Sequence, residues 1–455
     1  MTEQLTVDLL VIGFGKGGKT LAATLGRQRK TVVMVERSAQ MYGGTCINIG
    51  CVPTKSMVYQ AEHLATGTRH ADDYRSAVDT TQNLTTYLRG QNFAMLDNLE
   101  TVTVLTGTAH FLDATTVVVH TVDGADHTVS ATHIVIGTGS EPVVPEIPGV
   151  AGNDRVLTST DMLVEQELPG RLVVLGGGYV GLEFAAMYAG YGSAVTVLER
   201  HERILGHEDD EIADSVGEIL AEVGVEVLTA AQVTEVVDGT VHFLRDGQSS
   251  TVEADLILVA LGRRAVTGDL GLAAAGIAAR PDGSIVVDEH LRTSRSHIFA
   301  VGDVNGGPQF TYISLDDYRI VLGQLTDTGS RNTGDRVAVP YSLFLTPPLS
   351  RVGLTERAAR AAGHQVKVAA MRVADMATVP RARIVGDPRG MMKVVVDAAT
   401  DEILGAALLS HDSHEVINTV ALAMRHGITA SALRDEIYTH PSMTEAFNQL
   451  LGALH

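Results

Sequence analysis

The sequence predicts an α/β fold with two Rossmann-like dinucleotide-binding domains and a C-terminal α+β domain. Two observations support this prediction. A pattern of strand, glycine loop, helix, strand and terminal acid occurs twice, and in each copy the acid follows the first glycine by 23 residues. A linker-like stretch at residues 329–335 then precedes a new series of strands and helices that begins at about Tyr341.

The first dinucleotide-binding pattern lies at the N-terminus. Gly13 permits a tight turn, Gly15 lets a pyrophosphate approach the backbone, and Gly18 allows the helix to pack closely on the strand. The start of the helix offers free N–H groups to phosphates, and Glu36 can accept hydrogen bonds from a ribose. Strand, loop, helix and second strand are predicted at residues Thr6–Ile12, 13–18, Lys19–Gln28 and Thr31–Glu36.

The second copy uses Gly176, Gly178 and Gly181 in its loop and ends at Glu199. A lone GxGxxG motif is weak, but two copies in full strand–helix–strand context are strong, and two sites suit a flavin plus a nicotinamide. An acid at the ribose favours NADH, although Arg200 and Arg203 could soften its repulsion of a 2′-phosphate and leave NADPH possible. The strand, the loop, the end of the helix and the second strand are predicted at Arg171–Leu175, 176–181, Tyr191 and Ala194–Leu198.

Composition excludes several other classes. The formal charge of −20, the 4% aromatic content and the absence of tryptophan argue against a nucleic-acid partner. The N-terminus has no basic region, and the apolar run Val7–Ile12 is too short for a signal sequence or a membrane span. We therefore expect a cytoplasmic protein without a membrane partner. Further apolar strands that end in small residues are predicted at Thr132–Gly139, Asp255–Gly262 and Ile298–Asp303.

The chain has only two cysteines, Cys46 and Cys51. A secreted disulfide scaffold would use more cysteines and spread them along the chain, so the close pair favours redox chemistry. A zinc site is less favoured because no histidine or third cysteine is near in sequence, although distant ligands remain possible. A helix that begins near the pair would lower a thiol pKa.

Residues 43–55 read GGTCINIGCVPTK, which resembles the redox-disulfide segment of class I pyridine nucleotide–disulfide oxidoreductases. That family includes dihydrolipoamide dehydrogenase, glutathione reductase and mercuric reductase. The resemblance implies that Cys51 is the sulfur next to the flavin and that Cys46 is the interchange sulfur that meets substrate. It also implies that Lys55 lies beside the reactive flavin nitrogen with Glu183 as its partner. Electrons would pass from a reduced nicotinamide through FAD to the Cys46–Cys51 disulfide.

The resemblance assigns further roles. The motif HPxxxE is met by His440 and Glu445, so His440 would serve the cysteines of the opposite subunit, and the enzyme would be a homodimer. Glu445 would hold the imidazole in one orientation. Gly302–Asp303 resembles the pair that holds the polyol chain of the flavin. The other cofactor-binding residues expected outside the two glycine loops are Gly44, Thr45, Lys55, Thr138, Gly139 and Gly262.

By the same resemblance, the chain divides into domains. The FAD-binding domain is expected at residues 1–150 and, as a second, central part, at 269–335. An NAD(P)H-binding domain is expected at 151–268, and a C-terminal dimerisation domain at 336–455.

The substrate is narrowed by what the chain lacks. It ends in LGALH without the C-terminal cysteines of mercuric reductases and large thioredoxin reductases, and Tyr438 stands where dihydrolipoamide dehydrogenases usually have a second histidine. Some segments instead resemble a bacterial subgroup, the reactive-chlorine-resistance flavoproteins, whose members are associated with reduction of copper(II) and hypothiocyanous acid. These segments are residues 14–20, 39–42, 309–320 and 346–353.

The sequence therefore predicts an FAD- and NADH-dependent reductase of a small oxidant or of copper(II). Dihydrolipoamide dehydrogenase is the alternative enzyme, a mercuric reductase-like metal reductase is less favoured, and a flavoprotein scaffold with negligible turnover also stays open. Metal binding is left unknown. His63, His411, His414 and Met443 are conceivable copper ligands, but surface or core roles are favoured for them.

Overall fold

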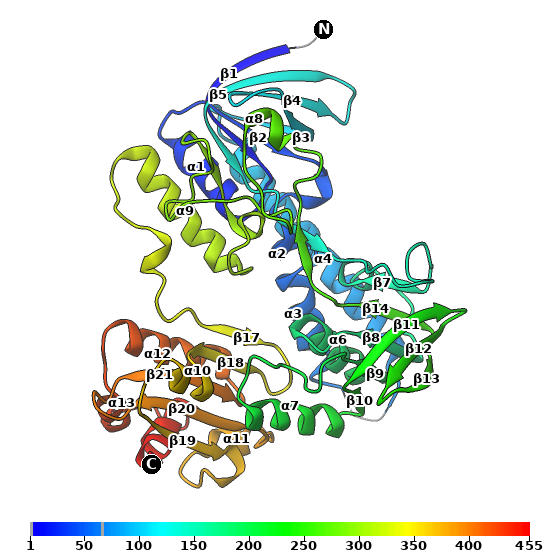
Figure 1. The fold of residues 1–455 in the computed structure, drawn as a ribbon, viewed down its shortest axis with the longest axis vertical. Coiled ribbons are helices and arrows are strands. Elements are labelled where there is room, and N and C mark those ends of the chain that lie inside the picture. The colour runs from blue at the N-terminus through cyan, green and yellow to red at the C-terminus, as the bar shows by residue number, and fades with distance from the viewer. Residues whose placement is uncertain (1–2, 65–67) are drawn as a thin grey trace. The chain divides into compact units, whose positions relative to one another are not determined.

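The computed structural model describes residues 3–64 and 68–455 (Figure 1). The chain forms two compact units, each assembled from separate stretches of sequence. Both contain helices and sheets, which confirms the predicted α/β class. The first unit comprises Met1–Ser56, Ser76–Val143 and Gly262–Arg336, and the second comprises Met57–Arg75, Val144–Leu261 and Val337–His455. The domain boundaries expected from the sequence remain a prediction.

The first unit is built on a six-stranded sheet. Its first strand, β1 (Glu3–Ile12), pairs in parallel with β2 (Val32–Glu36) on one side and with β5 (Asp126–Ile136) on the other. The chain therefore leaves the end of β1 where the strand order reverses, which is where open α/β sheets bind ligands. The remaining strands are β3 (Val102–Phe111), β4 (Thr116–Thr121) and β16 (Ile298–Ala300), with a separate pair of β6 (Ser140–Pro142) and β15 (Arg263–Ala265).

Two hydrophobic cores hold this unit together. One packs α1 (Lys16–Arg27) and α9 (Thr311–Thr326) through side chains such as Leu21 and Ile320, and the other contains Phe111 and Ile134. The buried face of α1 arises because its apolar residues recur at helical spacing. The other helices that contribute residues to this unit are α2 (Thr45–Asn48), α3 (Cys51–Ala61), α4 (Ala71–Asp97) and α8 (Leu272–Ala275).

In residues 156–259 the second unit repeats this strand arrangement. Strand β8 (Arg171–Leu175) lies between β9 (Ala194–Leu198) and β14 (Leu256–Val259), and all three are parallel. Both β8 and β9 coincide with their predicted ranges. The other elements of this part are β7 (Val156–Thr158), α5 (Ser159–Met162), α6 (Tyr179–Gly190), α7 (Asp210–Glu222), β10 (Val225–Leu228), β11 (Ala231–Val237), β12 (Thr240–Arg245) and β13 (Gln248–Glu253).

The C-terminal part of the second unit has a five-stranded antiparallel sheet, in the order β17-β18-β21-β20-β19. Its first strand begins at Tyr341, as the sequence predicts. Antiparallel strands with segregated helices make this part α+β. Its elements are β17 (Tyr341–Leu343), β18 (Leu349–Gly353), α10 (Glu356–Ala361), β19 (Val366–Arg372), α11 (Arg381–Ile384), β20 (Met391–Asp397), β21 (Ile403–Leu409), α12 (Ser413–Arg425), α13 (Ala430–Asp435) and α14 (Ala446–Leu450).

The strands expected to begin at Thr6 and Thr132 begin earlier, at Glu3 and Asp126, because the β pairing continues beyond the apolar run. Glycine turns account for other boundaries that were predicted wrongly. Helix α1 begins three residues before the expected Lys19, because Gly15 already serves as its N-cap. The strand expected to end at Gly139 stops at Ile136, since Gly139 has a φ of +71°. The strand expected to end at Asp303 stops at Ala300, and Asp303 lies in a 3₁₀ helix. Smaller differences affect the strand expected at Asp255–Gly262 and the helix expected to end at Tyr191.

In the described part of the chain, no helix is both long enough and apolar enough to cross a membrane.

The turn after β1 leads to a test of backbone strain. Gly13 has a φ of +102°, and a Cβ atom there would lie 2.3 Å from the carbonyl oxygen of Gly137. We expect Gly13→Ala to lower the free energy of unfolding by more than the roughly 1–2 kcal/mol that a left-handed backbone alone costs. Thermal unfolding of the purified protein measures this.

The matched control is Gly90→Ala in α4, where a Cβ atom has nothing within 4 Å. An exposed helical glycine is less stable than alanine by about 0.5–1 kcal/mol, so this variant should unfold at an equal or higher temperature. Equal unfolding temperatures for the two variants would contradict the close approach at Gly13.

Candidate active site

The two glycine loops share one hydrogen-bond plan. In the first, a carboxylate oxygen of Glu36 accepts a hydrogen bond of 3.0 Å from the N–H of Phe14, the residue after the first glycine. In the second, Glu199 accepts one of 2.7 Å from the N–H of Gly177. Each acid also accepts from the backbone N–H two residues further on. The repeat seen in the sequence is therefore also a repeat of atomic contacts.

Both loops suit a pyrophosphate. Gly15 and Gly178 are the N-caps of α1 and α6, and neither helix start receives a side-chain cap. A Cβ atom at Gly178 would meet nothing within 4 Å, and one at Gly15 only a carbonyl oxygen at 3.7 Å. Open space in front of uncapped helix N-termini fits the phosphates of FAD in the first unit and of a pyridine nucleotide in the second.

The third glycine of each loop has a packing role. A Cβ atom at Gly18 would lie 2.8 Å from Val11, and one at Gly181 would lie 2.0 Å from the carbonyl oxygen of Gly176. The close approach of helix to strand and turn therefore excludes a side chain. Gly262, in contrast, is exposed, has a φ of +109° and has open space around it.

Asp303 is oriented by polar neighbours. Its carboxylate accepts a hydrogen bond of 2.6 Å from Ser140, whose hydroxyl in turn accepts one of 2.8 Å from the guanidinium of Arg263. The preceding residue, Gly302, donates its N–H to the buried carboxylate of Asp317 at 2.6 Å. These contacts fix the turn expected to hold the polyol of the flavin. Ser140, Arg263 and Asp317 were not predicted; Ser140 reaches Asp303 from 163 positions away in sequence.

The loop before the cysteines is held tightly. Gly43 and Gly44 have φ values of +101° and +77°, and a Cβ atom at Gly44 would lie 2.7 Å from Cα of Gly15. The amide of Asn48 donates to the carbonyl oxygens of Tyr42 and Gly44 at 3.0 and 2.9 Å. The loop thus brings Thr45 and the cysteines next to the first glycine loop.

The two cysteines differ in environment. Both are thiols in this structure; Cys46 lies in the short helix α2 and is half-buried, while Cys51 begins α3 and is exposed. A hydrogen bond from Cys46 is the main cause that lowers the pKa of Cys51 to about 6, against a smaller opposing effect of burial. The hydrogen bond to Cys51, with burial, raises the pKa of Cys46. Near neutral pH the pair therefore holds its negative charge on Cys51.

Thr311 and Lys55 also act on Cys51. The hydroxyl of Thr311, at the start of α9, lies 3.6 Å from the sulfur, and both residues help to lower its pKa. Lys55 follows Cys51 by one helical turn and is half-buried. Thr311 was not predicted as a site residue, although it lies in segment 309–320, one of those that resemble the reactive-chlorine-resistance flavoproteins. Its contact joins residues 260 positions apart.

Lys55 and Glu183 belong to different units, so the expected pairing between them stays a prediction. Within the second unit, Glu183 is buried, and its carboxylate accepts a hydrogen bond of 2.9 Å from the N–H of Phe344. Glu183 is therefore a buried, hydrogen-bonded residue and not a charge on a solvent-facing side of its helix.

His440 and Glu445 are in contact as the sequence predicts. Nδ1 of His440 lies 2.9 Å from a carboxylate oxygen of Glu445, whose other oxygen accepts from the N–H of Ser442 at 2.9 Å. Burial would raise the pKa of Glu445, but these hydrogen bonds outweigh it and lower the pKa. The His440 side chain is 66% exposed, and Nε2 has no partner among the described residues. The imidazole is thus held by one nitrogen and available through the other.

The four residues considered as copper ligands each have a different environment. Met443 is in the core of the C-terminal part, and His63, in the turn after α3, hydrogen-bonds the carbonyl oxygen of Tyr59. His411 contacts Asp412, while His414 packs against Phe344. Across residues 3–64 and 68–455, no three metal-ligating side chains (His, Cys, Asp or Glu) come together as a metal site.

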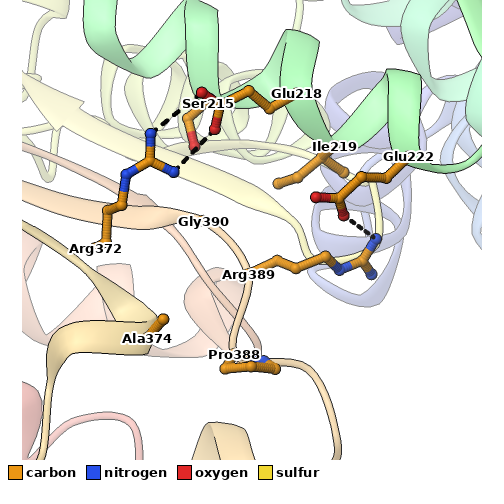
Figure 2. A pocket seen from close by; sticks show the side chains of 9 residues that line it. All are labelled: Ser215, Glu218, Ile219, Glu222, Arg372, Ala374, Pro388, Arg389 and Gly390. Atoms are coloured by element: carbon orange, nitrogen blue, oxygen red, sulfur yellow. Dashed lines mark hydrogen bonds and ion pairs between the residues drawn. The ribbon is translucent and has the colours of Figure 1, made fainter.

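A cavity of about 220 Å³ lies between α7 and the C-terminal sheet (Figure 2). Arg372 faces Glu218, with contacts of 2.9 and 3.1 Å, and Arg389 lies 3.7 Å from Glu222. The cavity is smaller than the roughly 300–1,000 Å³ of typical ligand sites, and none of the predicted site residues line it. Its paired charges link α7 to the sheet.

Comparison with known families decides the class of protein. A family model described as pyridine nucleotide-disulphide oxidoreductase matches residues 7–317, and one described as the dimerisation domain of the same family matches residues 339–451. The chain belongs to the pyridine nucleotide-disulphide oxidoreductase family. As a member of that family it is an FAD- and pyridine nucleotide-dependent disulfide reductase, and its dimerisation domain supports a homodimer.

Individual relatives agree with this assignment. The chain is 45% identical over 443 residues to the probable pyridine nucleotide-disulfide oxidoreductase RclA of Escherichia coli (strain K12), covering 97% of this chain and 98% of RclA. It is 32% identical to dihydrolipoyl dehydrogenase of Mycobacterium bovis, covering 98% of each. The solved Cu(II) complex of HOCl-induced flavoprotein disulfide reductase RclA from Escherichia coli matches with a TM-score of 0.93 and 43% identity, covering 99% of both chains.

The contact between Thr311 and Cys51 makes a testable prediction. In a Cys46→Ser background, Cys51 is the only thiol and the serine hydroxyl replaces the donor. Adding Thr311→Val should raise the pKa of Cys51 by about one to two units, since a hydrogen bond to a charged group contributes about 1.5–3 kcal/mol. The pH dependence of alkylation measures this. Thr311→Ser keeps the hydroxyl and should leave the profile unchanged; equal profiles for the Val and Ser variants would disprove the contact.

Proposed function

We propose that the chain is an NADH-dependent flavoprotein that reduces a small oxidant, such as hypothiocyanous acid or copper(II), through Cys46 and Cys51. The observation that carries this proposal is the unequal pair of sulfurs, with the lowered pKa on Cys51 and a neutral, half-buried thiol at Cys46. A dithiol with one stabilised thiolate is suited to two-electron exchange with a small substrate.

Different residues of the chain would bind FAD and stabilise the thiolate. Gly15, Gly44, Thr45 and Asp303 would hold FAD, which when bound supplies the two-electron chemistry that links a nicotinamide to sulfur. The thiolate form of Cys51 would be stabilised by Cys46, Thr311 and Lys55.

Cys46 would meet the substrate. His440, held by Glu445, would accept the thiol proton from the cysteines of the other subunit and return it, since an imidazole can act as both base and acid in proton transfer. Because this histidine serves the opposite subunit in the family pattern, each site of the homodimer would need both chains.

The substrate class rests on what lies around the cysteines and on the relatives. A small oxidant needs only an accessible dithiol and no groove for a peptide or a large cofactor. RclA has been solved as a complex with Cu(II). Because RclA is 43% identical to this chain, that complex supports copper(II) as a candidate substrate here. Dihydrolipoamide is the second candidate, because dihydrolipoyl dehydrogenase aligns over nearly the whole chain.

A stopped-flow panel tests the substrate. Enzyme reduced beforehand with NADH is mixed with hypothiocyanous acid, copper(II), lipoamide or oxidised glutathione. We expect the first two to reoxidise it fastest, and Cys46→Ser to slow that reaction by roughly two orders of magnitude or more, because the nucleophile is lost. FAD content and reduction of FAD by NADH are the controls and should be retained.

A scaffold without turnover would lose nothing on Cys46→Ser, so unchanged rates would refute the proposal. Fastest reoxidation by lipoamide would instead assign the chain to the second candidate.

We propose NADH over NADPH because of the acid at the end of β9. Glu199 is buried, and besides Gly177 it contacts Nδ1 of His201 at 2.5 Å. Arg203, one of the arginines that could receive a 2′-phosphate, pairs with Asp210 and Asp214. An acid that remains at the ribose would repel that phosphate.

The nucleotide preference has its own test. The kcat/KM for NADH should exceed that for NADPH, and Glu199→Gln should reduce the ratio by about tenfold or more, because it removes a charge-assisted bond to the ribose and the repulsion of phosphate. The glutamine keeps an oxygen for the N–H of Gly177. Glu226→Gln, at an exposed position on β10, is the control and should not change the ratio. A wild-type preference for NADPH would contradict this assignment.

A further inference from the structure

Lys19 is a buried lysine without a charged partner. It lies in the first turns of α1, only 5% of the residue is exposed, and its ammonium donates to the carbonyl oxygen of Gly43 at 3.3 Å and to the amide oxygen of Asn92 on α4. Both acceptors are neutral, and the described residues offer Lys19 no ion pair. Burial lowers the pKa of Lys19 to about 8, with a further contribution from Lys16.

Such a residue is costly for the fold. Lysine is rarely buried unless it is paired, since removing an ammonium from water without a counter-charge costs its favourable free energy of hydration. The two neutral hydrogen bonds satisfy donors of the ammonium but not its charge. A buried cation that meets only neutral groups in one state of a protein suggests that an anion arises beside it in another state.

Among the residues that the structure describes, Cys46 is the one titratable group of opposite charge that acts on Lys19. Gly43, which Lys19 holds, precedes Cys46 by three residues, and the positive φ values of Gly43 and Gly44 turn the chain directly into α2. The lysine therefore holds the loop that places Cys46.

The cysteine pair creates a need for this charge. With a thiolate on Cys51, ionisation of Cys46 would place a second negative charge beside the first, and both the hydrogen bond to Cys51 and burial raise the pKa of Cys46. The two lysines divide between the sulfurs, because Lys19 acts on Cys46 whereas Lys55 acts on Cys51.

We propose that Lys19 is a positioning residue for the interchange thiol: its ammonium fixes the loop through Gly43 and stays protonated as the counter-charge of the Cys46 thiolate that attacks substrate. The inference rests on the proposed redox role of the pair. In this step the S–H bond of Cys46 breaks, its proton passes to the base of the site, Lys19 neither gains nor loses a proton, and no electron moves.

The groups that face these atoms come from several elements. Lys16 faces Lys19 from the same helix, and Asn92 faces it from α4. Cys46 is faced by Cys51 from α3 and by Thr311 from α9. Of these, only the lysines carry a positive charge, and Lys19 is the one that acts on Cys46.

The test measures the pKa of Cys46 directly. Cys51→Ser leaves Cys46 as the only thiol of the chain, and the pH dependence of its alkylation by iodoacetamide is followed in the FAD-loaded protein. Adding Lys19→Gln, which keeps a donor for Gly43 but removes the charge, should shift the profile upward by at least about one pH unit, a tenfold loss of rate below the pKa. Lys19→Arg should retain the profile.

Lys30→Gln is the matched control, because Lys30 is an exposed lysine that pairs with Asp8, and it should leave the profile unchanged. Asn92→Asp is the second variant, to be used if Lys19→Gln does not fold and retain FAD. It gives Lys19 a carboxylate partner and should shift the profile in the same upward direction.

A profile that is unchanged by Lys19→Gln or by Asn92→Asp overturns the proposal and leaves Lys19 a purely structural or phosphate-binding role. The readout does not depend on any oxidant, so failure of the stopped-flow panel with a shifted alkylation profile would count against the proposed substrate and not against Lys19.

Discussion

The hydrogen bond between Cys46 and Cys51 is the interaction on which the site depends. It makes two chemically identical side chains unequal, because it stabilises a thiolate on Cys51 and keeps the proton on Cys46. The surrounding elements reinforce the difference. The start of α3, Thr311 and Lys55 favour charge on Cys51, whereas the loop through Gly43 and Gly44 holds Cys46 close to the phosphate-binding turn.

The same hydrogen-bond plan occurs in both glycine loops. In each half, an acid at the end of the second strand is fixed by a backbone N–H of the glycine loop, and an uncapped helix faces open space. The acid that is expected to bind the ribose thus also fixes the shape of the loop. One backbone arrangement can therefore serve a flavin in the first unit and a nicotinamide in the second, with the difference left to side chains around it.

The sequence predicts the parts of this design that are local. Both glycine loops, their strands and acids, the cysteine segment and the contact between His440 and Glu445 each fall within a short stretch, so spacing alone reveals them. Contacts between distant segments were not predicted. Thr311 reaches Cys51, and Asn92 reaches Lys19, only because α9 and α4 pack beside the loop. Strand ends were missed where a glycine of positive φ stops a strand inside an apolar run.

The central claim is that electrons from NADH are transferred to the sulfur pair of Cys46 and Cys51. Quantitative mass spectrometry after alkylation under anaerobic conditions tests this most directly. The oxidised, FAD-loaded protein should resist alkylation, and one equivalent of NADH should make both Cys46 and Cys51 alkylatable. Thiols that react equally with and without NADH, or that stay unreactive after bound FAD has been reduced, would contradict the account.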